Sequence, residues 1–141
     1  SSYLAFPGPP RLKLMPSTAN RLFGTRGGCC MNPLTTKRIL PLARSQHVKI
    51  PLPMRACYDL RLPRAMRRSG VEVQRLPARL AWRVFTQSTF NVAVRDPARL
   101  QRQFAWAGSL AESIPVYALS YPMGMRILPE VVRAIASTVP S

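Results

Sequence analysis

Acidic side chains are scarce in this 141-residue chain, which has only five Asp and Glu residues, the first of them Asp59. Five scattered carboxylates argue against a catalytic carboxylate pair, which needs two of them at one site. No run of about 18 apolar residues occurs, so the sequence predicts no membrane span. A chain that begins at Ser1 rather than at Met is consistent with removal of a targeting peptide.

Metal ligands are few as well, with three cysteines and one histidine. Structural zinc sites usually use ligand pairs separated by about two to four residues, whereas Cys29 and Cys30 are adjacent. A metal or redox site built from this pair with Cys57 and His47 is the alternative. An odd number of cysteines is unlike a secreted disulfide scaffold. We therefore expect reduced thiols, with no metal and no cofactor.

Motifs for phosphate cradling or nucleophilic catalysis are also missing. The glycines at 24, 27 and 28 lie in a basic loop without the strand and helix that flank a phosphate-binding motif. A Cys–His nucleophile has no support beyond the presence of both residue types. The sequence thus predicts a protein that is not an enzyme and has no small-molecule substrate.

Positive charge is abundant by contrast. The 21 Lys and Arg residues give a formal net charge of +16, and all but Lys13, Lys37 and Lys49 are arginine. Residues 103–141 are neutral, so the whole excess lies before Gln103. Arginine pairs bidentately with phosphate and stacks on bases, so we expect a polyanionic partner, most simply nucleic acid.

The chain is expected to have two parts. Residues 1–46 predict an extended basic arm without its own core, because prolines and glycines interrupt every periodic run. Residues 47–141 predict a small α/β domain of the α+β class. Strands are expected at 47–50, from 70, and at 114–121, a short helix at 63–69, and a loop or short helix at 98–104.

Two segments of this domain have clearer patterns. Residues 82–95 alternate with period two and are rich in β-branched and aromatic side chains, which predicts a strand in a projecting hairpin near 82–102. Residues 128–139 predict a C-terminal helix that packs on the core, because Leu128, Val131, Val132 and Ile135 form an apolar stripe after Pro129.

Nucleic-acid contact is expected from basic residues that recur along the arm and continue into the domain. In the arm they are interleaved with Tyr3, Phe6 and Phe23, and unpaired bases stack on such rings. The candidate RNA-binding residues are Arg11, Arg21, Arg26, Lys37, Arg38, Arg44, Lys49, Arg55, Arg64, Arg67, Arg68, Arg79, Arg83, Arg95 and Arg99. The alternative is a solvated basic surface. No base-reading pattern is present, so these side chains would position the protein on RNA.

An Arg-, Pro- and Gly-rich arm on a small α/β body resembles ribosomal proteins, especially those of organelles. Residues 70–95 resemble the middle of the small-subunit ribosomal protein ten family. Residues 76–79, Leu-Pro-Ala-Arg, match its Leu-Pro-Thr-Arg-like stretch in three of four places, and Ser88 falls where that family has the serine of its hairpin tip. Thr89 and Phe90 stand where the family has Pro and His. The resemblance implies a ferredoxin-like body whose hairpin inserts among ribosomal RNA and proteins.

The leading hypothesis is therefore a structural constituent of the mitochondrial ribosome in the matrix. Its partners would be ribosomal RNA and neighbouring ribosomal proteins. The alternative is an accessory structural subunit of an organellar membrane complex, whose basic patches would meet anionic lipid head groups. A cysteine-dependent metal or redox protein is the third reading.

Overall fold

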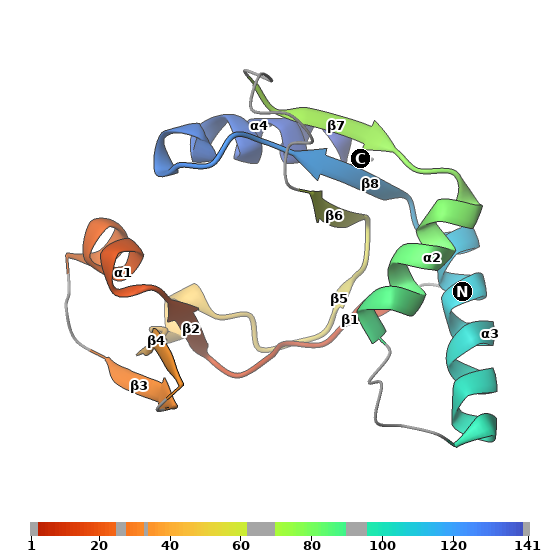
Figure 1. Ribbon diagram of the computed structural model, residues 1–141, viewed down its shortest axis with the longest axis horizontal. Helices are drawn as coiled ribbons and strands as arrows, with labels where there is room; N and C mark the ends of the chain where they lie inside the picture. The colour runs from red at the N-terminus through yellow and green to blue at the C-terminus, as the bar shows by residue number, and fades with distance from the viewer. Residues whose placement is uncertain (1–2, 25–27, 33, 62–69, 90–95, 140–141) are drawn as a thin grey trace. The chain divides into compact units, whose positions relative to one another are not determined.

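The structure, a computed structural model, describes residues 3–24, 28–32, 34–61, 70–89 and 96–139 (Figure 1). The chain forms two compact units. The N-terminal unit is Leu4–Pro53, and the C-terminal unit combines Ser1–Tyr3 with Met54–Ser141. Both contain helices and strands, so the fold is α+β. Within the described ranges, no helix combines the length and the apolarity that crossing a bilayer demands.

The N-terminal unit contains a three-stranded antiparallel sheet in the order β2-β4-β3, with α1 between β2 and β3 in sequence. A separate two-stranded ladder joins β1 to β5. The elements of this unit are β1 (Leu4–Ala5), β2 (Arg11–Leu14), α1 (Pro16–Phe23), β3 (Cys29–Asn32), β4 (Thr35–Pro41), the 3-10 turn η1 (Arg44–Gln46) and β5 (Leu52–Pro53).

Local sequence explains the bounds of α1. Pro16 occupies its first turn, where a missing amide hydrogen costs nothing. Gly24 ends the helix with φ at +62°, and its amide donates to the carbonyl oxygen of Asn20 at 2.9 Å. This left-handed cap is a conformation that glycine adopts without strain. The helix packs against β4, where Ala19 and Leu40 are buried.

Gly28 allows the close approach of β3 to β4. Its φ is +99°, and a Cβ atom there would lie 2.7 Å from the carbonyl oxygen of Ile39 and 2.8 Å from a methyl carbon of Leu40. Only glycine fits this position without displacing the neighbouring backbone.

The C-terminal unit is built on a mixed sheet in the order β6-β8-β7, in which β8 is parallel to β6 and antiparallel to β7. Helices α2 and α3 lie side by side, and their apolar faces pack with the start of β8 (Figure 1). The elements are β6 (Cys57–Arg61), β7 (Glu72–Arg75), α2 (Ala78–Thr89), α3 (Pro97–Ser113), β8 (Val116–Ser120), η2 (Met125–Ile127) and α4 (Leu128–Thr138).

The core of this unit is a continuous cluster of buried side chains from α2, α3 and β8. Leu110 and Val116 of this cluster are fully buried, and so is Leu119, which lies outside the cluster on β8. Helix α4 is fastened to the sheet by two tyrosines. The Tyr58 hydroxyl lies 2.5 Å from Oγ1 of Thr138, and the Tyr117 hydroxyl donates to the carbonyl oxygen of Thr138 at 3.3 Å; the two rings stack on each other within the sheet, with centroids 5.4 Å apart.

Several expected elements agree with the structure. The C-terminal helix expected at 128–139 is α4, the strand expected at 114–121 is β8, and the strand expected from 70 is β7. Within α4, Val131 is buried, but Val132 is 64% exposed and does not join the core as its stripe predicts. The short helix expected at 63–69 lies outside the described residues.

The β-hairpin near 82–102 is a wrong prediction. Residues up to Thr89 are helical in α2, and α3 begins at Pro97; residues 90–95 lie outside the described ranges. Ala81 and Phe85, one helical turn apart, are buried against Ala107 and Leu110 of α3. That packing outweighs the β-propensity of the segment. The ferredoxin-like arrangement is not confirmed either, since the described sheets have two or three strands.

Three smaller expectations also differ from the structure. Residues 98–104 belong to the long helix α3. Asp96 caps the start of this helix, because its carboxylate accepts a hydrogen bond from the Ala98 amide at 3.0 Å. No strand forms at 47–50. Residues 1–46 were expected to be an extended arm, whereas 4–53 forms a compact unit, so the boundary falls at 53/54 instead of 46/47.

Candidate nucleic-acid interface

The two units carry the same formal net charge but reach it differently. The N-terminal unit has eight Lys and Arg residues and no acidic residue, which gives +8. The C-terminal unit has 13 basic and five acidic residues, which also gives +8. The N-terminal unit thus has no carboxylate side chain of its own with which to neutralise its cations.

The register of the N-terminal sheet gathers cations on one face. Residues paired across strands share a face, and side chains alternate along each strand. Because Lys13 pairs with Ile39, and Ile39 with Cys29, these residues point to the same side as Arg11 and Lys37. Arg11, Lys13 and Lys37 are all exposed. We call the surface formed by Arg11, Lys13 and Lys37 the basic sheet face.

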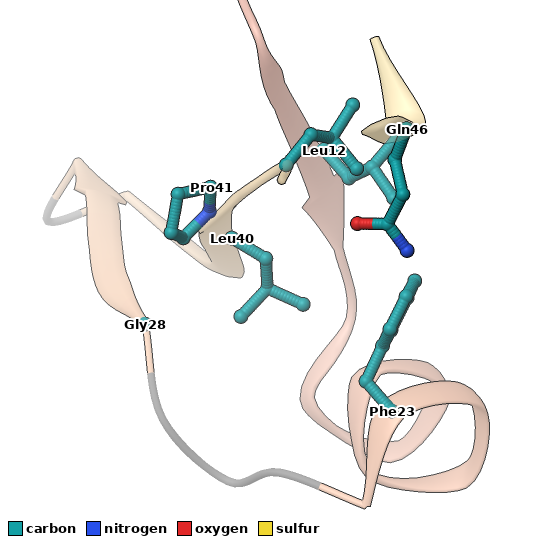
Figure 2. A pocket seen from close by; sticks show the side chains of 7 residues that line it. Leu12, Phe23, Gly28, Leu40, Pro41 and Gln46 are labelled. Carbon is teal, nitrogen blue, oxygen red and sulfur yellow. The ribbon is translucent and has the colours of Figure 1, made fainter. Parts of the chain in front are cut away.

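The opposite face of the same sheet has an apolar part that packs toward α1. Leu12 and Leu40 pair across β2 and β4 and point toward α1. A hollow of about 250 Å³ opens there, and Figure 2 shows Phe23, Leu40 and Gln46 directed into it. Its described lining contains no titratable side chain, so this hollow has no groups for acid, base or nucleophilic chemistry.

Arg38 lies on the covered side and is used within the unit. It is half-buried, and its guanidinium donates to the carbonyl oxygen of Gly28 at 3.4 Å. Its expected role in RNA binding is therefore less direct than that of Arg11 or Lys37. Arg21 on α1, Arg44 on η1 and the loop residue Lys49 are exposed outside the basic sheet face.

In the C-terminal unit, the candidate residues fall on separate elements. Arg55 precedes β6, Arg79 and Arg83 lie one turn apart on α2, and Arg99 lies on α3; all four are exposed. The candidates outside the described residues are Arg26, Arg64, Arg67, Arg68 and Arg95.

Lys13 and Arg102 are two exposed cations that the sequence analysis left out. Lys13 could have been found from the alternation of Arg11-Leu12-Lys13-Leu14, which places both cations on one strand face. Arg102 lies three residues after Arg99 on α3, and both line an open hollow of about 350 Å³ with Gln103 and Trp106. That spacing is informative only once 97–113 is known to be a helix.

The cysteines do not assemble a metal site. Among the described residues, no group of three His, Cys, Asp or Glu side chains lies close enough to hold a metal ion. Cys29 and Cys30 are exposed successive strand residues and so point to opposite faces. His47 makes a 2.8 Å hydrogen bond with the carbonyl oxygen of Gly8. Burial raises the pKa of the Cys57 thiol, whose Sγ lies 3.6 Å from Sδ of Met54.

No protein-family model, curated protein sequence or solved structure matches this chain in the three comparisons. The resemblance to the small-subunit ribosomal protein ten family therefore stays a prediction that rests on its own motif residues.

Proposed function

We propose that this protein is an RNA-binding structural constituent of the mitochondrial ribosome. It contacts ribosomal RNA through basic side chains, packs against neighbouring ribosomal proteins and has no catalytic role. The observation that carries the proposal is the acid-free N-terminal unit, whose sheet presents Arg11, Lys13 and Lys37 on one face opposite the face covered by α1.

The spacing of these cations suits a phosphodiester chain. Arg11 and Lys13 stand about 7 Å apart along β2, and Lys37 lies diagonally across on β4, about 7–8 Å from Lys13. Each of these two neighbouring separations is within the Debye length of about 8 Å at physiological salt, so Lys13 reinforces the attraction of both Arg11 and Lys37 for a polyanion. RNA that neutralises them releases counterions, and this release favours binding.

Exposed apolar side chains support the proposed packing against neighbouring ribosomal proteins. The N-terminal unit leaves large apolar residues open, including Phe6 at 76% and Leu34 at 95% exposed. Exposed apolar surface is what a chain that packs against neighbouring proteins is expected to present. The small-subunit assignment has weaker support, because the strand that should lead to its hairpin tip is helical in α2.

The proposal is tested by RNA binding at several salt concentrations. We expect the Arg11→Gln/Lys13→Gln/Lys37→Gln variant to lower the slope of log affinity against log salt by about 2 for single-stranded RNA. The matched control removes three exposed cations of the C-terminal unit, as Arg75→Gln/Arg126→Gln/Arg133→Gln. An equal loss in the control would show that the basic sheet face has no special role.

Association with ribosomes is tested separately in mitochondrial extracts. We expect the protein to sediment with ribosomal particles and to be released by high salt or nuclease. Retention with a membrane complex after nuclease treatment would contradict the proposal and favour the accessory-subunit alternative.

A further inference from the structure

One face of α3 combines cations with an exposed aromatic ring. Arg99, Arg102, Gln103 and Trp106 follow one another at i, i+3, i+4 and i+7, so they share a side of the helix. Together they line the open hollow of about 350 Å³. That volume falls within the range of about 300–1,000 Å³ that is usual for small-molecule sites. We call these four residues the α3 surface.

Trp106 is held in place but not covered. Its ring packs edge to face against Phe85 of α2, with ring centroids 6.3 Å apart and an interplanar angle of 62°. The side chain is nevertheless 42% exposed. An edge-to-face contact of this kind fixes the indole while leaving part of its surface open to a planar ligand.

A second aromatic pair between α2 and α3 differs from the Phe85–Trp106 pair. Trp82 and Phe104 are stacked at 5.7 Å with an interplanar angle of 22°, so these two rings already stack on each other. Phe104 is also 42% exposed, but Arg99 and Arg102 line the hollow at Trp106. The two pairs therefore offer a matched test of stacking with and without these cations.

Nearby negative charge does not neutralise the surface. The acidic residue nearest in sequence is Asp96, and its carboxylate accepts a hydrogen bond from the Ala98 amide at the start of α3. The described lining of the hollow contains no acidic side chain. A ligand that complements this surface combines a planar ring for Trp106 with negative charge for Arg99 and Arg102, and a nucleotide within an RNA strand has both features.

We propose that the α3 surface binds an unpaired base of single-stranded RNA, an inference that rests on the proposed function. The base stacks on the exposed part of Trp106. Arg99 and Arg102 contact the phosphates on either side of it, and Gln103 hydrogen-bonds to the base edge. Stacking is tolerant of sequence because every base has a planar face, so the site favours unpaired over duplex RNA without reading sequence.

The test uses the full chain carrying Trp82→Phe, so that fluorescence reports Trp106 alone. The probes are a ten-nucleotide oligoadenylate and an abasic ribose-phosphate strand of equal length and charge. We expect oligoadenylate to quench Trp106 and to bind about tenfold more weakly to the Trp106→Leu variant, while abasic-strand binding is unchanged. The matched control, Phe104→Leu, should bind both probes as the parent does.

A second variant protects the test against a folding defect. Arg99→Gln/Arg102→Gln changes two exposed side chains on the helix and should lower the salt slope by about 1.4 while quenching persists at low salt. Salt-dependent binding that is equal for both probes and does not quench Trp106 would overturn this inference and leave the proposed function standing. Absence of salt-dependent binding to either probe would overturn the proposed function itself. Equal quenching by polyglutamate would overturn the base-binding inference in favour of an acidic protein segment.

Discussion

The N-terminal and C-terminal units have the same formal net charge of +8, but they differ in the size of their buried apolar core. In the N-terminal unit, Ala19 and Leu40 are the described buried apolar residues. The C-terminal unit buries a continuous cluster that includes Leu110, Ile114 and Val116. Repulsion among like charges opposes folding, and burial of apolar surface favours it.

This difference assigns distinct physical roles to the two units. Because the C-terminal unit buries the larger apolar cluster, we expect it to stay folded without a bound partner. The N-terminal unit combines a small core with eight cations and no acid, so a bound polyanion should stabilise it much more than its neighbour. Both tryptophans, Trp82 and Trp106, lie in the C-terminal unit, so fluorescence reports that unit separately.

The largest expected effect comes from the core of the C-terminal unit. Leu110→Ala should lower its free energy of unfolding by about 3 kcal/mol, because Leu110 is fully buried and a cavity would remain. Leu40→Ala should cost the N-terminal unit only about 1–2 kcal/mol, since Leu40 borders an open hollow. Denaturant unfolding followed by tryptophan fluorescence measures the first, and amide hydrogen exchange in β4 measures the second. Equal losses would contradict the contrast between the two cores.

The second expected effect concerns Gly28, where β3 approaches β4 in the N-terminal unit. Gly28→Ala should destabilise that unit by about 2 kcal/mol, because φ is positive there and the new Cβ would meet the backbone of Ile39. The control is Gly8→Ala, whose added methyl group meets nothing within 4 Å. Amide exchange in β4 should rise in the first variant and not in the second. An unchanged exchange rate in Gly28→Ala would show that β3 does not need its close approach to β4.

The parts of the fold that could be predicted from sequence are those with local signals. Helix α4 has Pro129 in its first turn and an apolar stripe, and β8 is a short apolar run between breakers. Helix α2 could not be predicted in this way. Residues 82–89 fit both a period of two and a helical period, and only the packing of Phe85 against α3 decides between them.

The candidate site was predictable in composition but not in arrangement. An acid-free, arginine-rich N-terminal region indicates a polyanion partner from sequence alone. Which cations stand together depends on strand order and register, and Lys37 joins Lys13 only because β4 lies between β2 and β3. The α3 surface likewise needs the helix before Arg99 and Trp106 can be placed side by side.

A smaller effect is expected where α4 is fastened to the sheet. Tyr58→Phe removes the hydroxyl that lies 2.5 Å from Oγ1 of Thr138 and should cost the C-terminal unit about 1 kcal/mol. The control is Tyr121→Phe, because the Tyr121 hydroxyl makes no hydrogen bond to a described residue. The free energy of unfolding, followed by tryptophan fluorescence, should fall only in the first variant. Equal stability in the two variants would mean that the Tyr58 hydroxyl does not help to hold α4 on the sheet.

The smallest effect concerns thiol ionisation and again separates the units. Burial raises the pKa of the Cys57 thiol, so the folded C-terminal unit keeps that proton at a pH where the unfolded chain has lost it. Stability from this source is complete below the ordinary thiol pKa of about 8.5 and is lost as pH rises toward the higher folded value. The denaturant concentration at the unfolding midpoint should therefore decrease as the pH is raised from 7 to 9.5, and Cys57→Ala should make that decrease smaller.

The N-terminal cysteines provide the control. Cys29 and Cys30 are exposed, so the Cys29→Ala/Cys30→Ala variant should keep the pH dependence that Cys57→Ala loses. In the wild-type chain, alkylation at pH 8 should modify Cys29 and Cys30 before Cys57, because the thiolate is the reactive form and burial disfavours it at Cys57. Faster modification of Cys57 would mean that its thiol is open to solvent and that the C-terminal core ends short of β6.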